Sequence, residues 1–445
     1  MRTRCKKSKW QWGSYLSIGM AIFMATTAVH ASSEKPIKIG VLCPIKLLVG
    51  EHISTGAKIA ADEINASGGV SVGNEKRRIE IVVKDTNEGW STTEAPGSIE
   101  RAINIDKADF LIGGYNTEAV MAMQEVMADY KKILISNAMA PILSERVAKN
   151  YDRYKYWFRM SPNIFFYTRA VTYGLSTILD KIRMELGIKT PKVALLLAKS
   201  KVSEPIPGFV KPLEPKLGFE TVGVWWPANN ATDMSVELAA IRSSGAHVIY
   251  TFLPATSGSP FSKQWGELKI PAAPIGYNEQ MTERQWKLTG GLCEFEASVY
   301  TVARDMEITP RTQPFVKRFI EKVGETPLYQ AVGSYDAVYT IKEAVERAGT
   351  VETEAVLREL EKTDRVGAQG RIAYFPKGDK WPHDVISGPG YVPFVCVQWQ
   401  AGQLKGFWPD GRATHDEKKW EGVKYRGTAE YKLPPWMKSY WSPKK

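Results

Sequence analysis

Histidine and cysteine are scarce in this sequence, and the common catalytic patterns are missing. The 445 residues include five histidines and four cysteines, with no CxxC pair and no histidine at metal-ligand spacing from another histidine or cysteine. There is also no P-loop and no G-x-G-x-x-G motif, the usual cradles for nucleotide phosphates. These absences argue against a zinc enzyme, a dithiol redox protein and a nucleotide-binding enzyme, and we expect no cofactor and no metal.

Three cysteines remain beyond the N-terminal segment, and each lies in or beside an apolar or strand-like stretch. They are Cys43 in GVLC, Cys293 in GGLCEF and Cys396 in FVCVQW. At most one pair could form a disulfide, and a chain of this size does not need one to fold. We therefore predict that they are buried as small hydrophobic side chains.

One G-x-S-x-G match occurs, at residues 69–73, and it raises the alternative of an exported α/β hydrolase. A nucleophile elbow must follow a strand and open a helix, so that the serine is exposed at the top of the sheet. Here the match follows a helical pattern and precedes a strand-like one. We interpret it as a surface turn and do not expect an enzyme.

Long apolar runs are also lacking, apart from one near the N-terminus. Five basic residues precede YLSIGMAIFMATTAV, a run of about 15 residues that is too short for a bilayer span, and small residues follow at Val29 and Ala31. This pattern predicts a signal peptide over residues 1–31, cleaved after Ala31, and a periplasmic location. Without it the formal charge falls from +11 to +6, with basic and acidic residues interleaved, so nucleic acid is not indicated as a partner.

What the sequence does contain is a regular alternation of short apolar strands and helical segments. Such alternation predicts parallel sheets covered by helices on both faces. The pattern runs once to about residue 136 and restarts near residue 192, which indicates two similar α/β halves. The first set of expected strands is 37–43, 78–85, 109–114 and 132–136, and the second is 192–198, 220–226, 247–253 and 273–277.

A mainly helical section follows over residues 312–362, before expected strands at 371–375 and 394–400. The chain then ends in a tail, residues 409–445, that is rich in tryptophan and lysine. Large aromatic side chains are seldom left wholly exposed. We therefore expect the tail to wrap along the surface as an extended segment.

The stretch GGYNTEAV, residues 113–120, stands at the junction between an expected strand and an expected helix. In open α/β sheets ligands lie at the carboxyl ends of strands, where helix N-termini present N–H groups. We expect the two glycines to let a ligand approach the backbone. Asn116 and Thr117 could orient a polar group of a ligand or could only cap the helix, and the sequence leaves both possibilities open.

Eight segments in the right order resemble one family. IKIGVLCP, GEHISTGAKIAADEINASGGV, VKDTN, LIGGYNTEAV, ISNAMAPILSE, WFRMSPN, FVKRFIEKVGETP and SYDAVYTIKEAVERAG are similar to segments of solute-binding proteins of ABC importers, of the leucine/isoleucine/valine type. The resemblance covers about residues 36–408. No single segment is specific, and it is their order that carries the resemblance.

The resemblance implies a class I periplasmic-binding-protein fold, with two doubly wound lobes around a ligand cleft and three hinge crossings. Lobe 1 would comprise residues 36–158 and 304–368, and lobe 2 residues 159–303 and 369–408. A monomer would bind a small solute by lobe closure and deliver it to a membrane permease. A sensory receptor with the same clamshell is the alternative within this fold.

The family's site residues carry over only in part. Amino-acid binders of this type hold the α-carboxylate with groups at the helix start after LIGG, here Tyr115, Asn116 and Thr117, and with a threonine after the next strand, where Met139 stands in ISNAMAP. The position at which these binders have an acidic partner for the ammonium group aligns with Asn278, which carries no charge. A shift of the alignment by one residue would place Glu279 there and restore the acidic partner. We therefore hypothesise a ligand other than a free α-amino acid, such as an amide or a small carboxylate, held by a set of side chains that comprises Tyr115, Asn116, Thr117, Asn137, Met139, Tyr277 and Asn278.

Overall fold

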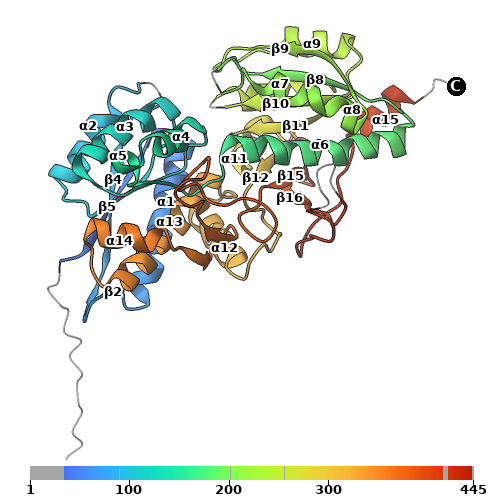
Figure 1. Cartoon of the computed structure of the whole chain (residues 1–445). Coiled ribbons are helices and arrows are strands. Elements are labelled where there is room, and N and C mark those ends of the chain that lie inside the picture. The colour runs from blue at the N-terminus through green and yellow to red at the C-terminus, as the bar shows by residue number, and fades with distance from the viewer. Residues whose placement is uncertain (1–34, 90, 201, 255, 414–418, 443–445) are drawn as a thin grey trace, which may run out of the picture. The chain divides into compact units, whose positions relative to one another are not determined.

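Two parallel-stranded sheets organise the chain, which we describe from a computed structural model covering residues 35–89, 91–200, 202–254, 256–413 and 419–442. The predicted signal peptide, residues 1–31, lies outside the described residues. Residues from Pro36 onward form one unit. The predicted α/β fold with parallel sheets is confirmed (Figure 1).

The first sheet has five parallel strands in the order β4-β1-β5-β6-β7. The helices that follow these strands in the chain cover it (Figure 1). The strands are β1 (Ile37–Cys43), β4 (Ile79–Asp85), β5 (Phe110–Gly113), β6 (Leu134–Ser136) and β7 (Trp157–Arg159), and the helices are α1 (Leu48–Ala66), α2 (Ala95–Asn104), α3 (Thr117–Tyr130), α4 (Ile142–Lys149) and α5 (Tyr151–Tyr154).

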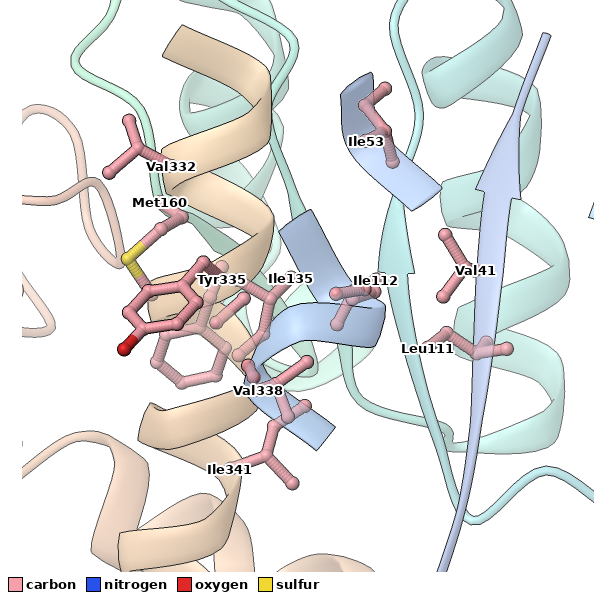
Figure 2. Packing of buried hydrophobic residues seen from close by; sticks show 14 of the residues in the cluster. Val41, Ile53, Leu111, Ile112, Ile135, Met160, Val332, Tyr335, Val338 and Ile341 are labelled. Carbon is pink, nitrogen blue, oxygen red and sulfur yellow. The ribbon is translucent and has the colours of Figure 1, made fainter. Parts of the chain in front are cut away.

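Helices from much later in the chain complete the core around this sheet. Side chains of α13 pack beside those of β5, β6 and α1, as Figure 2 shows for Val338, Ile112 and Ile135. A periodicity argument cannot foresee such a contact, because it joins segments about 200 residues apart. The late helices are α12 (Thr312–Val323), α13 (Tyr329–Ala348) and α14 (Thr353–Leu360).

The second sheet has seven strands in the order β16-β15-β12-β11-β10-β8-β9, and the pairs from β12 to β9 are parallel. β15 is antiparallel to both of its neighbours. The strands are β8 (Lys192–Leu197), β9 (Glu220–Trp225), β10 (Val248–Leu253), β11 (Ala273–Asn278), β12 (Ala297–Tyr300), β15 (Val395–Gln400) and β16 (Gln403–Trp408).

Helices bury both faces of this sheet. Along β8, Val193 and Leu195 belong to one hydrophobic cluster, and Ala194 and Leu196 to another, as the alternation of side chains in a strand requires. The helices are α6 (Ile164–Leu186), α7 (Ile206–Val210), α8 (Glu214–Leu217), α9 (Ser235–Ser243), α10 (Gly258–Glu267) and α11 (Glu283–Thr289), with a 3-10 turn at Lys211–Leu213.

Two small hairpins form separate two-stranded sheets. They are β2 (Val70–Val72) with β3 (Glu75–Arg77), and β13 (Asp364–Val366) with β14 (Arg371–Ala373). The G-x-S-x-G match falls in the first hairpin, with Ser71 in β2. Ser71 therefore does not stand at a strand-to-helix elbow.

The tail packs on the second sheet. The indole N–H groups of Trp436 and Trp441 donate hydrogen bonds to the carbonyls of Ile270 (2.9 Å) and Pro271 (2.7 Å). The expected surface-wrapping segment is therefore present, but it ends in a short helix, α15 (Pro435–Trp441), that the sequence did not predict. Within the described residues, none of the helices combines the length and apolar character that a bilayer crossing requires.

Candidate functional site

A cavity of about 670 Å³ lies where the carboxyl ends of strands from both sheets meet. In each sheet the strand that comes first in the chain has its next two strands on opposite sides: β1 lies between β4 and β5, and β8 lies between β9 and β10. This change of direction in the strand order is a topological switch point. Ligands of open α/β sheets bind at such switch points. The cavity is lined from the first sheet by residues that include Leu47, Glu88, Tyr115, Asn116, Thr117 and Met139, from the second by Ser200, Asn229, Asn230, Phe252, Thr256 and Tyr277, and from α13 by Tyr329.

The junction GGYNTEAV forms one wall of the cavity. Its two glycines are needed because a larger residue at either position would clash with neighbouring protein atoms. Gly113 and Gly114 have φ of +104° and +80°, and a Cβ on Gly113 would lie 2.2 Å from the carbonyl oxygen of Leu42. A Cβ on Gly114 would lie 2.6 Å from the side chain of Val120. These contacts and the positive φ angles account for both glycines without a ligand, and the expected approach of a ligand to their backbone stays a prediction.

Asn116 caps helix α3. Its side-chain oxygen accepts hydrogen bonds from the N–H groups of Glu118 (2.9 Å) and Ala119 (3.2 Å). Asn116 also lines the cavity, together with the neighbouring Tyr115 and Thr117. The structure thus shows capping, and ligand contact by this residue stays a prediction.

Five of the seven predicted site residues come together at the cavity: Tyr115, Asn116, Thr117, Met139 and Tyr277. Tyr277 stacks against Phe252 with ring centroids 5.1 Å apart. Met139, which stands where the resemblance implies a threonine, is half-buried. The wall beside it is therefore apolar where a hydroxyl group would have offered a hydrogen bond.

Asn137 and Asn278 are buried away from this cavity, and their amide groups have protein partners. Asn137 donates to the hydroxyl of Ser334 (3.0 Å) and accepts from that of Ser161 (3.0 Å), so it joins the end of β6 to α13. Asn278 donates to the carboxyl group of Glu296 (2.7 Å) and to the hydroxyl of Ser262. Both side chains hold elements of the protein together, and their predicted contact with a ligand has no support in this geometry.

The residue that lies beside the cavity at this position is the acidic Glu279, and not its neighbour Asn278. Its carboxyl group accepts hydrogen bonds from the hydroxyls of Tyr115 (2.6 Å) and Tyr277 (3.0 Å), both of which line the cavity. The alternating direction of side chains along an extended segment explains why Tyr277 and Glu279 meet while Asn278 points elsewhere. The shift of one residue considered from the sequence matches this placement.

Glu88 is a site residue that the sequence reasoning missed. It lines the cavity and is buried, and its pKa is raised, chiefly because burial removes water from the carboxyl group. The available signal was its place in VKDTNEGW, just past a strand whose carboxyl end belongs to the expected cleft. Burial and the carboxylate of Glu279 likewise hold the pKa of the Tyr115 hydroxyl well above its usual range, so this tyrosine is a hydrogen-bond donor.

Reactive groups are not gathered here. The described residues contain no group of three or more histidine, cysteine or acidic side chains placed to hold a metal ion. Cys43, Cys293 and Cys396 are free and buried, as predicted. Burial raises the pKa of Cys43 and of Cys293 to about 12, so both are protonated thiols at neutral pH.

Comparison with known proteins decides the family. A family model described as periplasmic binding protein matches residues 36–387, which is most of the chain. The chain belongs to the periplasmic binding protein family. It is accordingly a solute-binding protein, and its cavity has the position that ligand sites take in open α/β sheets.

The relatives of this periplasmic binding protein include two from Brucella melitensis biotype 1. The chain is 24% identical over 403 residues to Leu/Ile/Val-binding protein homolog 7, covering 87% of this chain and 95% of the relative. It is 23% identical over 417 residues to homolog 8, covering 90% and 97%. These matches agree with the resemblance stated from the sequence.

Solved structures share the fold. A putative branched-chain amino acid ABC transporter protein from Silicibacter pomeroyi superposes with a TM-score of 0.72 at 22% identity, covering 90% of this chain and 100% of that one. A solute-binding protein from R. palustris in complex with benzoate has a TM-score of 0.66 at 19% identity, covering 84% and 95%. These likenesses confirm the predicted class I binding-protein fold.

Proposed function

We propose that this periplasmic binding protein captures a small polar solute in the 670 Å³ cavity and delivers it to the permease of an ABC importer. The observation that carries the proposal is the convergence of strand ends from both sheets on one cavity. That volume suits a solute of the size of an amino acid, an amide or a small aromatic compound. Names of relatives and neighbours include Leu/Ile/Val-binding proteins and a complex with benzoate, which span this range.

The lobes of the proposed clamshell are residues 36–158 with 304–368, and residues 159–303 with 369–408. The chain leaves the first sheet after β7, returns after β12 to the helices α12, α13 and α14 that pack around that sheet, and reaches the second sheet again at β15. These passages would act as hinges, and closure would bury the solute between the lobes. Docking on a permease and export through a signal peptide cleaved after Ala31 complete the proposal, with a monomer as the working form.

The cavity walls favour a ligand other than a free α-amino acid. Met139 offers a thioether where a threonine would offer a hydroxyl group. The side-chain oxygen of Asn116 accepts hydrogen bonds from the start of α3, where it caps the helix. The relatives' names favour a transport component over a sensory receptor. Ser71, the residue on which a hydrolase would depend, lies in a hairpin outside both large sheets.

Thermal unfolding of the exported chain in the presence of amino acids, amides, aromatic acids and short carboxylates tests the proposal. A solute that binds only the folded state at 100 times its dissociation constant adds about 2.7 kcal/mol of stability, so at least one class should raise the unfolding temperature. Tyr277→Ala should abolish that shift, whereas Val236→Ala, on the exposed surface of α9, should keep it. A panel in which no solute raises the unfolding temperature contradicts the proposal.

A further inference from the structure

Glu88 occupies the backbone N–H groups of the junction that begins helix α3. One of its carboxyl oxygens, Oε2, accepts from the N–H groups of Tyr115 (3.0 Å) and Asn116 (2.6 Å). The other, Oε1, accepts from the hydroxyl of Thr86 (2.7 Å). The side chain of Glu88 is 3% exposed, so these bonds are made almost out of water.

These N–H groups are the ones that an anionic ligand would otherwise use. A helix N-terminus at the carboxyl end of a strand binds anions through its free N–H groups and its dipole. Here Glu88 takes two of them, and Asn116 takes those of Glu118 and Ala119. Four N–H groups of the junction therefore have protein acceptors, and a ligand carboxylate would have to displace Glu88 to reach the first two.

The charge around the cavity also disfavours a carboxylate. Glu88 and Glu118 line it, and Glu279 contacts two of the lining tyrosines. The described lining residues include no lysine and no arginine. Glu88 is buried, so its charge acts on a bound ligand with little screening and would destabilise an anion and stabilise a cation, whereas Glu118 is exposed and contributes less.

Aromatic rings provide the rest of a cation-binding environment. Tyr115, Tyr277 and Tyr329 line the cavity together with Phe252. The faces of such rings attract ammonium groups, and the attraction grows when water is excluded. Carboxyl groups and ring faces around one cavity suit a positively charged nitrogen on a small apolar body.

We propose that Glu88 is a specificity-determining residue that stands in for a ligand's carboxylate, and that the cavity selects small organic amines that lack a carboxylate. This inference rests on the proposed solute-binding function. The sequence analysis considered an amide or a small carboxylate as the ligand, and this inference puts an amine in the place of the carboxylate. A positively charged nitrogen in the cavity would lie beside the carboxyl groups of Glu88 and Glu118, which line it.

Calorimetric titration with matched series of compounds tests this selection on the exported chain. One series is 3-methylbutylamine, 4-methylpentanamide, 4-methylpentanoate and leucine, which share a branched body and differ in the polar group. A second series is phenethylamine, 3-phenylpropanamide, 3-phenylpropanoate and phenylalanine. We expect the amine to bind at least tenfold more tightly than the acid and the amino acid in at least one series.

Two substitutions of Glu88 separate its two effects, which are the occupation of the backbone N–H groups and the negative charge. Glu88→Gln keeps an oxygen for the N–H groups of Tyr115 and Asn116 but removes the charge, so amine affinity should fall about tenfold, and the acid should gain less affinity than it does in Glu88→Ala. Glu88→Ala frees both N–H groups, so affinity for the acid or the amino acid should rise relative to that for the amine. Glu100→Gln, an exposed carboxyl group on α2, is the matched control and should leave all affinities unchanged.

The outcomes distinguish this inference from the function on which it rests. An acid, an amide or an amino acid that binds more tightly than its amine counterpart overturns the selection of amines, while solute binding itself stands. If no compound of either series binds and the wider thermal panel is also negative, both proposals fail. If Glu88→Ala does not fold, the titrations of the unsubstituted chain and of Glu88→Gln still decide the matter.

Discussion

Asn278 and Glu279 are adjacent in the chain, but their side chains serve different parts of the structure. Asn278 bonds to Glu296 and Ser262 between elements of the second sheet and its helices, whereas Glu279 bonds to two tyrosines at the cavity. An alignment error of one residue therefore exchanges a packing residue for a site residue. Residue types alone could not resolve this, because both side chains are polar and both are buried.

At the residue scale, other parts of the site were predictable and some were not. Tyr115, Thr117, Met139 and Tyr277 lie at or within three residues of the carboxyl ends of expected strands, so their position at the cavity follows from the topology of parallel sheets. Glu88 was missed because its role depends on hydrogen bonds to residues 115 and 116, which a strand pattern does not reveal.

Glu296 provides a prediction about pH. It is buried beside Asn278, and burial raises its pKa to about 7. Hydrogen bonds with Ser262 and Asn278 lower the pKa, but their effect is smaller than that of burial. Between its unfolded value near 4.5 and about 7, the folded state holds a proton that the unfolded state has lost, so this group lowers stability as pH rises through that window. The contribution amounts to at most about 3 kcal/mol.

Glu296→Gln should remove this pH dependence while keeping an oxygen for the amide group of Asn278. Urea unfolding at pH 5 and pH 8 gives the change in free energy of unfolding for both proteins. The unsubstituted chain should lose more stability between these values than the variant. Equal changes in the two proteins would show that Glu296 does not titrate in this range.

At the scale of elements, buried apolar runs were predicted well. The strands expected at 37–43 and 192–198 appear as β1 and as β8, which ends at Leu197, because both of their faces are covered and few polar positions obscure the pattern. Between β8 and β9 the chain forms α7, a 3-10 turn and α8 in place of one continuous helix. Pro212 and Pro215 explain the breaks, since proline cannot donate a backbone hydrogen bond, whereas Pro207 lies in the first turn of α7, where proline is tolerated.

Short strands were missed for a different reason. β7 and β12 have three and four residues, too few to show a period. Each completes the parallel part of its sheet beside a strand that was expected, β6 or β11. Pairing with a neighbour, rather than the local sequence, defines these elements.

Helix α15 leads to a prediction about the tail. Met437 is fully buried against the second sheet and its helices, and truncating a buried methionine costs about 2–5 kcal/mol. Met437→Ala should lower the free energy of unfolding by that amount, measured by chemical denaturation. Ser439→Ala, an exposed change on the same helix, should alter it by less than about 0.5 kcal/mol. Equal, small effects of the two substitutions would mean that the tail does not stabilise the fold.

At the scale of the whole molecule, the order of several weak motifs predicted the family when no single one could. The alternation of strands and helices gave two α/β halves, and the two sheets bear this out. The packing of α12, α13 and α14 around the first sheet came only from the resemblance. Contacts between segments so far apart depend on tertiary packing, which local periodicity does not encode.

The central claim is that a solute binds between two lobes that close over it. Small-angle X-ray scattering of the exported chain, with and without a saturating amount of a solute found in the thermal screen, tests this most directly. Closure predicts a smaller radius of gyration with the solute, and no change with a compound that leaves the unfolding temperature unaltered. Saturating solute binding with an unchanged radius of gyration would contradict the account.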